Sequence, residues 1–98
     1  MTVFLIYEDD HGVIGVAASF KAAKQFLLRH KWVTEHTYIW VNDRLNEDGD
    51  HYFHLNEVYG DNWKEAFLNF SKGELDNTSF WVQERELNEE ESYCVLYH

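Results

Sequence analysis

Residues 3–31 read VFLIYEDDHGVIGVAASFKAAKQFLLRHK and contain the clearest structural signals in the chain. Two β-prone runs, Val3–Tyr7 and Val13–Ala17, flank a polar turn that ends in Gly12. Alternating or continuous apolar runs on either side of such a turn predict a β-hairpin. Gly15 lies inside the second run, where a glycine marks a bulge or a close backbone contact.

A helix follows the hairpin. Ser19 is a favourable N-cap residue, because its hydroxyl can accept a hydrogen bond from a free backbone N–H of the first turn. Behind it an apolar stripe recurs at helical spacing. The stripe consists of Phe20, Ala23, Phe26, Leu27 and His30. We therefore expect a helix over residues 20–31.

The rest of the chain predicts more strands and a second helical region. The expected strands are Thr37–Val41, Tyr52–Leu55, Ser79–Leu87 and Tyr93–Tyr97. The second helical region covers residues 56–70, with a break at Gly60 and a new N-cap at Asp61. Ser71 and Glu74 have the spacing of a capping box and predict one more short helical turn. The order ββαββαββ predicts an α+β fold in one domain over residues 1–98, with an antiparallel or mixed sheet and helices packed on one face.

Aromatic side chains make up 17% of the 98 residues, enough to build a core in a short chain. The expected core residues are Phe4, Ile6, Val16, Phe26, Leu27, Phe67 and Val82. Another group of rings allows three interpretations: core packing, stacking on nucleic-acid bases, and anchoring of a protein interface. This group contains Trp32, Tyr38, Trp40, Tyr52, Trp63 and Trp81.

The formal net charge is −10, from eighteen acidic and eight basic residues. Such a charge repels nucleic acid and anionic membranes and attracts basic partners, although acidity also serves solubility alone. The N-terminal residues lack the basic flank of a signal peptide, and no apolar run approaches the roughly 20 residues of a membrane span. Cys94 is the single cysteine, so an internal disulfide is excluded. These features predict a cytoplasmic protein.

The basic residues are concentrated on the first predicted helix. Residues 11–34 contain no acid and four basic residues, Lys21, Lys24, Arg29 and Lys31. A basic helix face on an acidic body is suited to docking or to self-association as a homodimer. A solvated face that serves neither purpose is the alternative.

No pattern in the chain predicts catalysis, a cofactor or a metal site. The consecutive ligand types of residues 8–11 point in different directions and suit a hairpin turn. The acidic segment 43–50 fails as an EF-hand, because Arg44 and Leu55 stand where carboxylates are required. The glycine-rich phosphate loops and nucleophile motifs of common enzyme classes are also absent from the sequence. We therefore expect a protein that is not an enzyme.

Parts of the sequence resemble a group of small proteins encoded by phages and prophages of Gram-positive bacteria. The resemblance lies in the first strand, in the segment from His11 to Ala17, and in Ser19 with the helix behind it. The late strand 80–87, which reads FWVQEREL, is also similar. What the resemblance implies is a phage context, in which small acidic proteins inhibit host defence enzymes, anti-CRISPR proteins among them.

Charge and resemblance together favour a non-enzymatic inhibitor that binds a host nucleic-acid-handling protein, such as a Cas9-type nuclease, by imitating DNA. The alternative is a phage accessory or assembly protein that binds another protein or itself. In the inhibitor, the expected partner-binding carboxylates are those of two acidic turns. They are Asp43, Glu47, Asp48 and Asp50 in one turn, and Glu89, Glu90 and Glu91 in the other.

Overall fold

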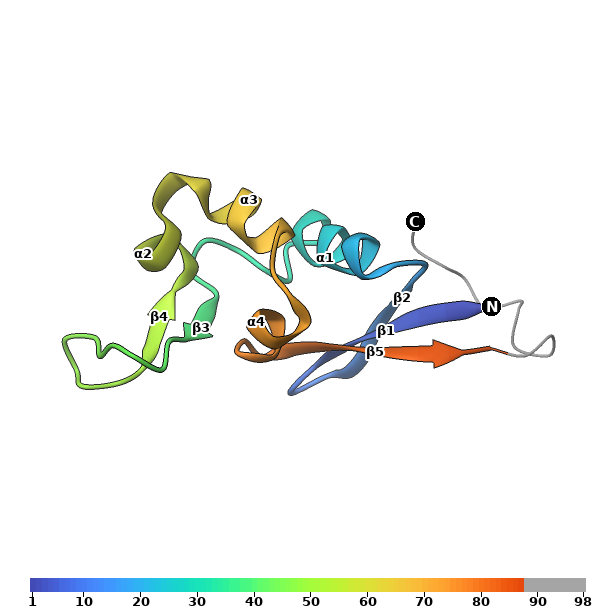
Figure 1. Ribbon diagram of the computed structural model, residues 1–98, viewed down its shortest axis with the longest axis horizontal. Helices are drawn as coiled ribbons and strands as arrows, with labels where there is room; N and C mark the ends of the chain where they lie inside the picture. The colour runs from blue at the N-terminus through green and yellow to red at the C-terminus, as the bar shows by residue number, and fades with distance from the viewer. Residues whose placement is uncertain (88–98) are drawn as a thin grey trace.

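The computed structural model describes residues 1–87 of the chain. Its elements are β1 (Thr2–Glu8), β2 (Gly12–Ala17), α1 (Phe20–Arg29), β3 (Tyr38–Trp40), β4 (Tyr52–His54), α2 (Leu55–Tyr59), the 3-10 turn η1 (Gly60–Asn62), α3 (Trp63–Leu68), α4 (Lys72–Asp76) and β5 (Phe80–Glu86). The fold is α+β, as predicted, with the order ββαββαβ when the helical segments between β4 and β5 are counted as one region (Figure 1). The predicted last strand, 93–97, lies outside the described residues.

The strands form two antiparallel sheets, so the prediction of a single sheet is wrong. β2, β1 and β5 form a three-stranded sheet in that order, and β3 pairs with β4 alone. The free edge of β3 is occupied by the loop before β5, because the Trp40 N–H donates to the Asn77 carbonyl at 2.8 Å. That bond fixes the short hairpin beside the larger sheet. Figure 1 shows the hairpin at one end of an elongated molecule and the three-stranded sheet at the other.

The opening hairpin forms where the sequence predicts it. The register shifts between Ile6, which pairs with Gly15, and Tyr7, which pairs with Val13, so that Ile14 is the extra residue of a β-bulge in β2. Gly15 also meets the ring of Phe26, since a Cβ built at this glycine would lie 2.8 Å from the ring's Cζ. Both expectations for this glycine are confirmed.

Helix α1 begins as predicted, with the Ala22 N–H donating to the Ser19 hydroxyl at 3.0 Å. It ends at Arg29, two residues before the predicted end, and Lys31 adopts a left-handed φ of 59°. The prediction of a basic helix face is wrong for Lys24, one of its four residues. Lys24 is buried and donates from Nζ to the backbone carbonyls of Leu68 and Phe70, the latter at 2.9 Å.

The helical region between β4 and β5 breaks at Gly60, as predicted. The predicted N-cap at Asp61 is wrong, because the 3-10 turn continues through this residue and α3 begins one residue after Asn62. The capping box between Ser71 and Glu74 is confirmed and starts α4.

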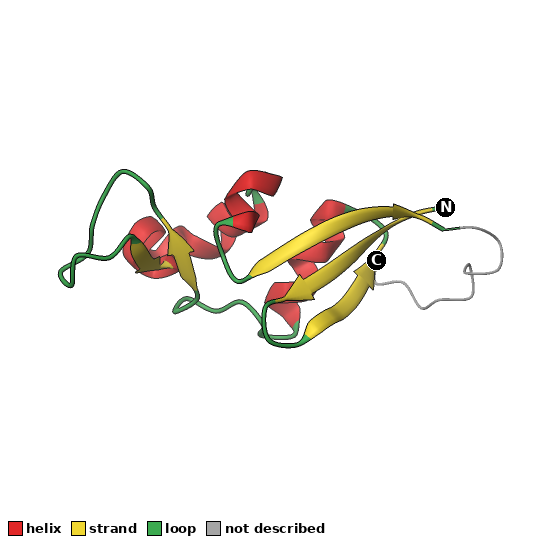
Figure 2. Cartoon of the chain, turned by 90° about the horizontal axis from the view of Figure 1, so that it is seen from below, coloured by secondary structure: helices red, strands yellow, loops and turns green. Residues whose placement is uncertain are grey.

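One hydrophobic cluster joins both sheets and the helices. Of the predicted core residues, Ile6, Leu27, Phe67 and Val82 are buried, and Phe4 and Phe26 pack against the cluster while partly buried. Val16 is wrong. It is opposite Leu5 in the register, and that residue alternates with Ile6, so both Val16 and Leu5 face away from the helices. Figure 2 shows the three strands of this sheet lying in front of the helices.

Candidate protein-binding cleft

The β3–β4 hairpin separates its side chains by strand alternation. Ile39 and Phe53 are paired across the hairpin and buried in the core, at 4% and 5% exposure. The residues on either side of them therefore point to the opposite face. These residues are Tyr38, Trp40, Tyr52 and His54. Trp40 and Tyr52 meet edge to face with their ring centroids 4.9 Å apart. The outer face of the hairpin is thus an aromatic surface, open to solvent at Tyr38 and Tyr52.

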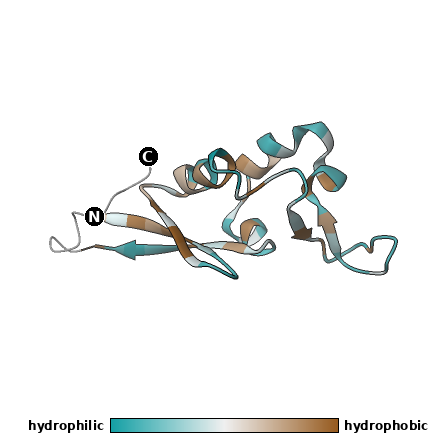
Figure 3. Ribbon diagram, turned by 180° about the vertical axis from the view of Figure 1, so that it is seen from behind, coloured by the Kyte–Doolittle hydropathy of each residue, from teal (hydrophilic) through white to brown (hydrophobic). Residues whose placement is uncertain are grey.

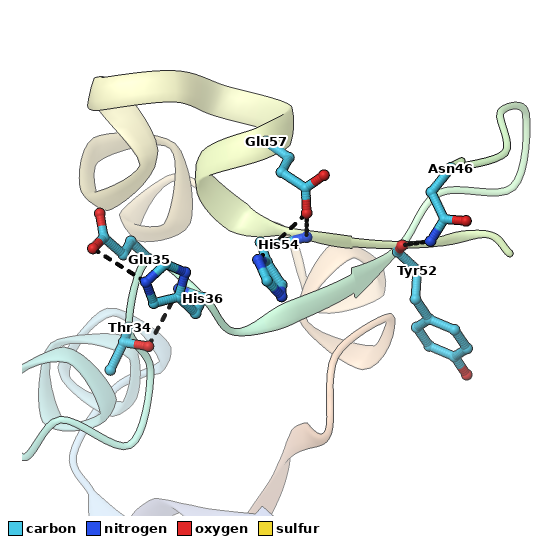
Figure 4. A network of polar contacts seen from close by, with 7 residues as sticks. All are labelled: Thr34, Glu35, His36, Asn46, Tyr52, His54 and Glu57. Carbon is cyan, nitrogen blue, oxygen red and sulfur yellow. Dashed lines mark hydrogen bonds and ion pairs between the residues drawn. The ribbon is translucent and has the colours of Figure 1, made fainter. Parts of the chain in front are cut away.

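A polar cluster continues this surface at the base of the hairpin, as Figure 4 shows. The rings of His36 and His54 lie 5.3 Å apart, and each imidazole faces a carboxylate at 3.4 Å, from Glu35 and Glu57 respectively. The Glu57 carboxylate also accepts the backbone N–H of His54 at 2.9 Å, which ties the end of β4 to the start of α2. This cluster fixes the end of the hairpin that carries Tyr38.

The acidic loop between β3 and β4 is organised by Asn46. Its side-chain oxygen accepts the backbone N–H groups of Asp48 and Asp50, both at 2.9 Å, and its amide donates to the Tyr52 carbonyl at 2.9 Å (Figure 4). The Nδ1 atom of His51 lies at hydrogen-bonding distance, 3.0 Å, from the carbonyl oxygens of both Val41 and Arg44. Figure 3 shows the loop as a mostly hydrophilic extension at the end of the molecule. The loop is therefore held in shape by side-chain bonds that leave its carboxylates exposed.

A cleft of about 880 Å³ lies between this hairpin and the turn end of the three-stranded sheet. The segment between α4 and β5 lies between the two sides, because the Asn77 carbonyl accepts from Trp40 and the Ser79 carbonyl accepts from the Asp9 N–H at 3.1 Å. Two kinds of side chain dominate the lining. The aromatic ones are Trp32, Tyr38, Trp40, Tyr52 and Phe80. The acidic ones are Glu8, Asp9, Asp48, Asp50 and Asp76.

Glu8 and His11 form a fixed pair on the sheet side of the cleft. The Glu8 carboxylate accepts a hydrogen bond from His11 Nδ1, and the Asp10 N–H donates to the same oxygen at 3.2 Å. These bonds, the His11 contact above all, hold the pKa of Glu8 below its ordinary value, so the carboxylate stays charged. The His11 ring in turn meets Trp32 edge to face, with centroids 5.2 Å apart. The pair therefore positions an indole at the cleft.

The structure divides the predicted partner-binding carboxylates into three groups. Asp48 and Asp50 line the cleft, while Asp43 and Glu47 are exposed on the loop outside its lining. In the described part of the chain, none of these four carboxylates forms an ion pair. The predicted residues Glu89, Glu90 and Glu91 lie outside the described residues.

The sequence interpretation did not single out Glu8, Asp9 and Asp76 as candidate binding residues, although all three line the cleft. Both Glu8 and Asp9 were assigned to a hairpin turn. Asp9 lies in that turn, whereas Glu8 is the last residue of β1 and pairs with Gly12, and both residues line the cleft. The alternation of aromatic residues around Ile39 and Phe53 predicts an aromatic outer face of the hairpin, but it does not locate these three carboxylates. The neighbours of that face depend on tertiary contacts and not on local sequence.

The lining of the cleft offers negative charge and aromatic surface. Among residues 1–87, no group of three or more histidine, cysteine or acidic side chains is arranged to hold a metal ion. None of the described residues that line the cleft is Lys or Arg. In the same part of the chain, no helix is long and apolar enough to cross a membrane. An acidic cleft with aromatic walls is suited to cationic groups.

Comparison of the chain with protein-family models, with curated proteins and with solved structures finds no match. The resemblance to phage proteins therefore stays a prediction.

Proposed function

We propose that this protein is a non-enzymatic binding protein whose acidic cleft and loop engage a basic surface on a partner protein. The observation that carries this proposal is the composition of the cleft, in which five carboxylates stand beside aromatic rings with no described Lys or Arg among them. Carboxylates gathered without cations create a negative potential that attracts basic surfaces and repels phosphates.

The order of the loop supports binding by carboxylates. Asn46 fixes the loop with bonds to Asp48 and Asp50 before any partner arrives. A preorganised loop loses less conformational entropy on binding than a mobile one does. Since the loop carboxylates form no ion pair within residues 1–87, they also have no internal cation to release when a partner's Lys or Arg approaches.

The finer proposal is that the partner is a nucleic-acid-handling enzyme, of the Cas9-type nuclease kind, and that binding inhibits it by occupying its nucleic-acid channel. Such channels are lined with Lys and Arg, which bind the phosphate backbone. A net charge of −10 on a chain of 98 residues supplies the complementary charge. The proposed biological setting is inhibition of a host defence enzyme by a phage protein.

Capture of partners from a host lysate, identified by mass spectrometry, tests the class of partner. Recovery of a basic nucleic-acid enzyme supports the proposal, and recovery of virion or replication proteins supports the alternative of an accessory or assembly protein. The captured enzyme is then assayed for activity, and for competition between this protein and DNA.

Three variants locate the binding carboxylates. One replaces Asp48 and Asp50 with Asn, the second replaces Asp43 with Asn and Glu47 with Gln, and the third replaces residues 89–91 with Gln. Each is checked for folding by circular dichroism. We expect the Asp48/Asp50 variant to lose the most inhibition, since these residues line the cleft. Full inhibition by all three variants, or inhibition without competition against DNA, would contradict mimicry through these turns.

A further inference from the structure

We propose that the cleft binds the arginine side chain of an exposed partner segment, with the guanidinium stacked on the aromatic rings of the β3–β4 hairpin and bonded to the cleft carboxylates. This inference rests on the proposed function and names the chemical group that the cleft selects. The juxtaposition that carries it is a ring surface and a set of carboxylates within one cavity of about 880 Å³.

The ring surface combines exposed tyrosines with rings that already have aromatic neighbours. The His51 imidazole lies tilted against Trp40 and the His54 imidazole against Tyr38, each with ring centroids 4.6 Å apart. Trp40 and Tyr52 are cross-strand neighbours that meet at an interplanar angle of 78°, an edge-to-face contact that leaves a face of one ring uncovered by the other. Tyr38 and Tyr52 also stand edge to face, at 80°, and are 57% and 49% exposed. A cation within about 6 Å of such a ring face is attracted by the ring quadrupole.

The protein's own loop cation does not occupy this surface. Arg44 is the loop's basic residue, and its guanidinium lies over the ring of Phe53 at 4.2 Å. Phe53 belongs to the opposite, buried face of the hairpin. The chain itself thus shows a guanidinium stacked on one hairpin ring, while Tyr38 and Tyr52 on the outer face remain about half exposed.

The carboxylates favour arginine over lysine. A guanidinium is planar and carries five N–H donors, so it can stack on a ring and bond carboxylates in its own plane at the same time. The cleft supplies acceptors from several elements: Asp48 and Asp50 on the loop, Asp9 in the turn after β1, and Asp76 at the end of α4. A lysine ammonium is a compact, strongly hydrated charge that gains less from flat rings. Phosphate ligands are repelled by the same carboxylates.

The test uses an arginine-rich Gly/Ser peptide with blocked ends, and matched peptides in which lysine or citrulline replaces arginine. Binding to the full chain is measured by isothermal titration, and the site is located by NMR shifts of the indole N–H groups. We expect the arginine peptide to bind and to shift Trp32 and Trp40. The lysine peptide should bind several-fold more weakly, and the citrulline peptide, which lacks the charge, should not bind.

Variants that remove a ring and keep every charge test the contribution of ring stacking to binding. Trp40→Leu should weaken arginine-peptide binding about 2- to 30-fold, the range expected for loss of a cation–π contact. Trp81→Leu is the matched control, because Trp81 is exposed on the three-stranded sheet and is not part of the cleft lining. The Trp81→Leu protein should bind the peptide with unchanged affinity. If Trp40→Leu fails to fold by circular dichroism, Tyr52→Leu takes its place, since Tyr52 is half exposed.

Equal affinity for the arginine and lysine peptides, or unchanged affinity in the folded ring variant, would overturn the inference. If the Asp48/Asp50 variant then lost binding while the ring variant did not, the peptide would be bound by charge without a contribution from ring stacking. If only the proposed function fails, the arginine peptide binds but no basic partner is captured from the lysate. Capture of a partner without any peptide binding would reject the arginine cleft and leave the proposed function intact.

Discussion

At Gly15 the backbone of β2 and the ring of Phe26 occupy adjoining space, and no side chain fits between them. A Cβ at this position would lie 2.8 Å from the ring's Cζ, closer than such contacts normally allow. We expect Gly15→Ala to destabilise the fold by about 1–3 kcal/mol, the usual cost of overpacking, with the lower end reached if the partly buried ring tilts away. Urea unfolding followed by fluorescence measures this. An unchanged midpoint would mean that the ring moves at no cost.

Lys31 is a non-glycine residue with a left-handed φ of 59°, directly after the C-cap of α1. This conformation crowds a Cβ and is most readily adopted by glycine. Lys31→Gly should therefore stabilise the protein by a few tenths to about 1 kcal/mol, less the entropy that glycine adds to the unfolded chain. Thermal unfolding measures the change, with Lys21→Gly inside the helix as the control, where about 1 kcal/mol should be lost.

Glu8 gives the cleft a pH response. Its pKa is lowered from the ordinary value of 4.5, chiefly by the hydrogen bond from His11. A carboxyl with a depressed pKa in the folded state contributes stability above that ordinary value, and the contribution is lost as the pH falls through the folded pKa. The wild-type protein should lose more stability than Glu8→Gln between pH 5 and pH 3. Asp43→Asn removes the same charge from an exposed loop and should follow the wild-type curve.

At the scale of elements, α1 shows how burial depends on one stripe of residues. Leu27 is fully buried among both sheets and helices, while Gln25 on the same helix is exposed. Leu27→Ala should cost about 2–5 kcal/mol, a large part of the 5–15 kcal/mol that holds a typical domain together. Gln25→Ala should be nearly neutral. Equal denaturant midpoints for the two variants would contradict the assigned helix face.

The elements that could be predicted from sequence are those fixed by local patterns. The opening hairpin, α1 with its Ser19 cap, and the Ser71 capping box depend on residues a few positions apart, and all are confirmed. The division into two sheets was not predictable in this way. β3 pairs with β4 alone, and at its other edge the Trp40 N–H donates to the Asn77 carbonyl, a contact between segments distant in the chain.

At the scale of the molecule, the cleft was predictable only in part, for the same reason. The acidic loop was recognised from its composition, and Asp48 and Asp50 do line the cleft. The aromatic residues of the hairpin were assigned three possible roles because composition does not reveal which face of a short strand is buried. Glu8 and Asp76 are separated by 68 residues, and only the packing of the hairpin against the end of the larger sheet brings them to one cavity.

The charge of the whole molecule should govern how fast a basic ligand arrives, and the cleft should govern how long it stays. A field from −10 formal charges steers cationic ligands over distances that salt shortens to about 8 Å at physiological ionic strength. The association rate of the arginine peptide, followed by stopped-flow tryptophan fluorescence, should therefore fall steeply as salt rises, while the dissociation rate changes little.

Two variants divide these effects, because they remove charge and ring surface separately. Asp43→Asn with Glu47→Gln lowers the charge outside the cleft lining, so it should slow association and leave dissociation unchanged. Trp40→Leu keeps every charge and removes a ring, so it should keep the salt dependence of association and dissociate faster. An association rate that does not respond to salt would mean that the acidic field plays no part in capture. Faster dissociation in the charge variant would mean that Asp43 and Glu47 contact the ligand, which would extend the binding surface from the cleft onto the outer loop.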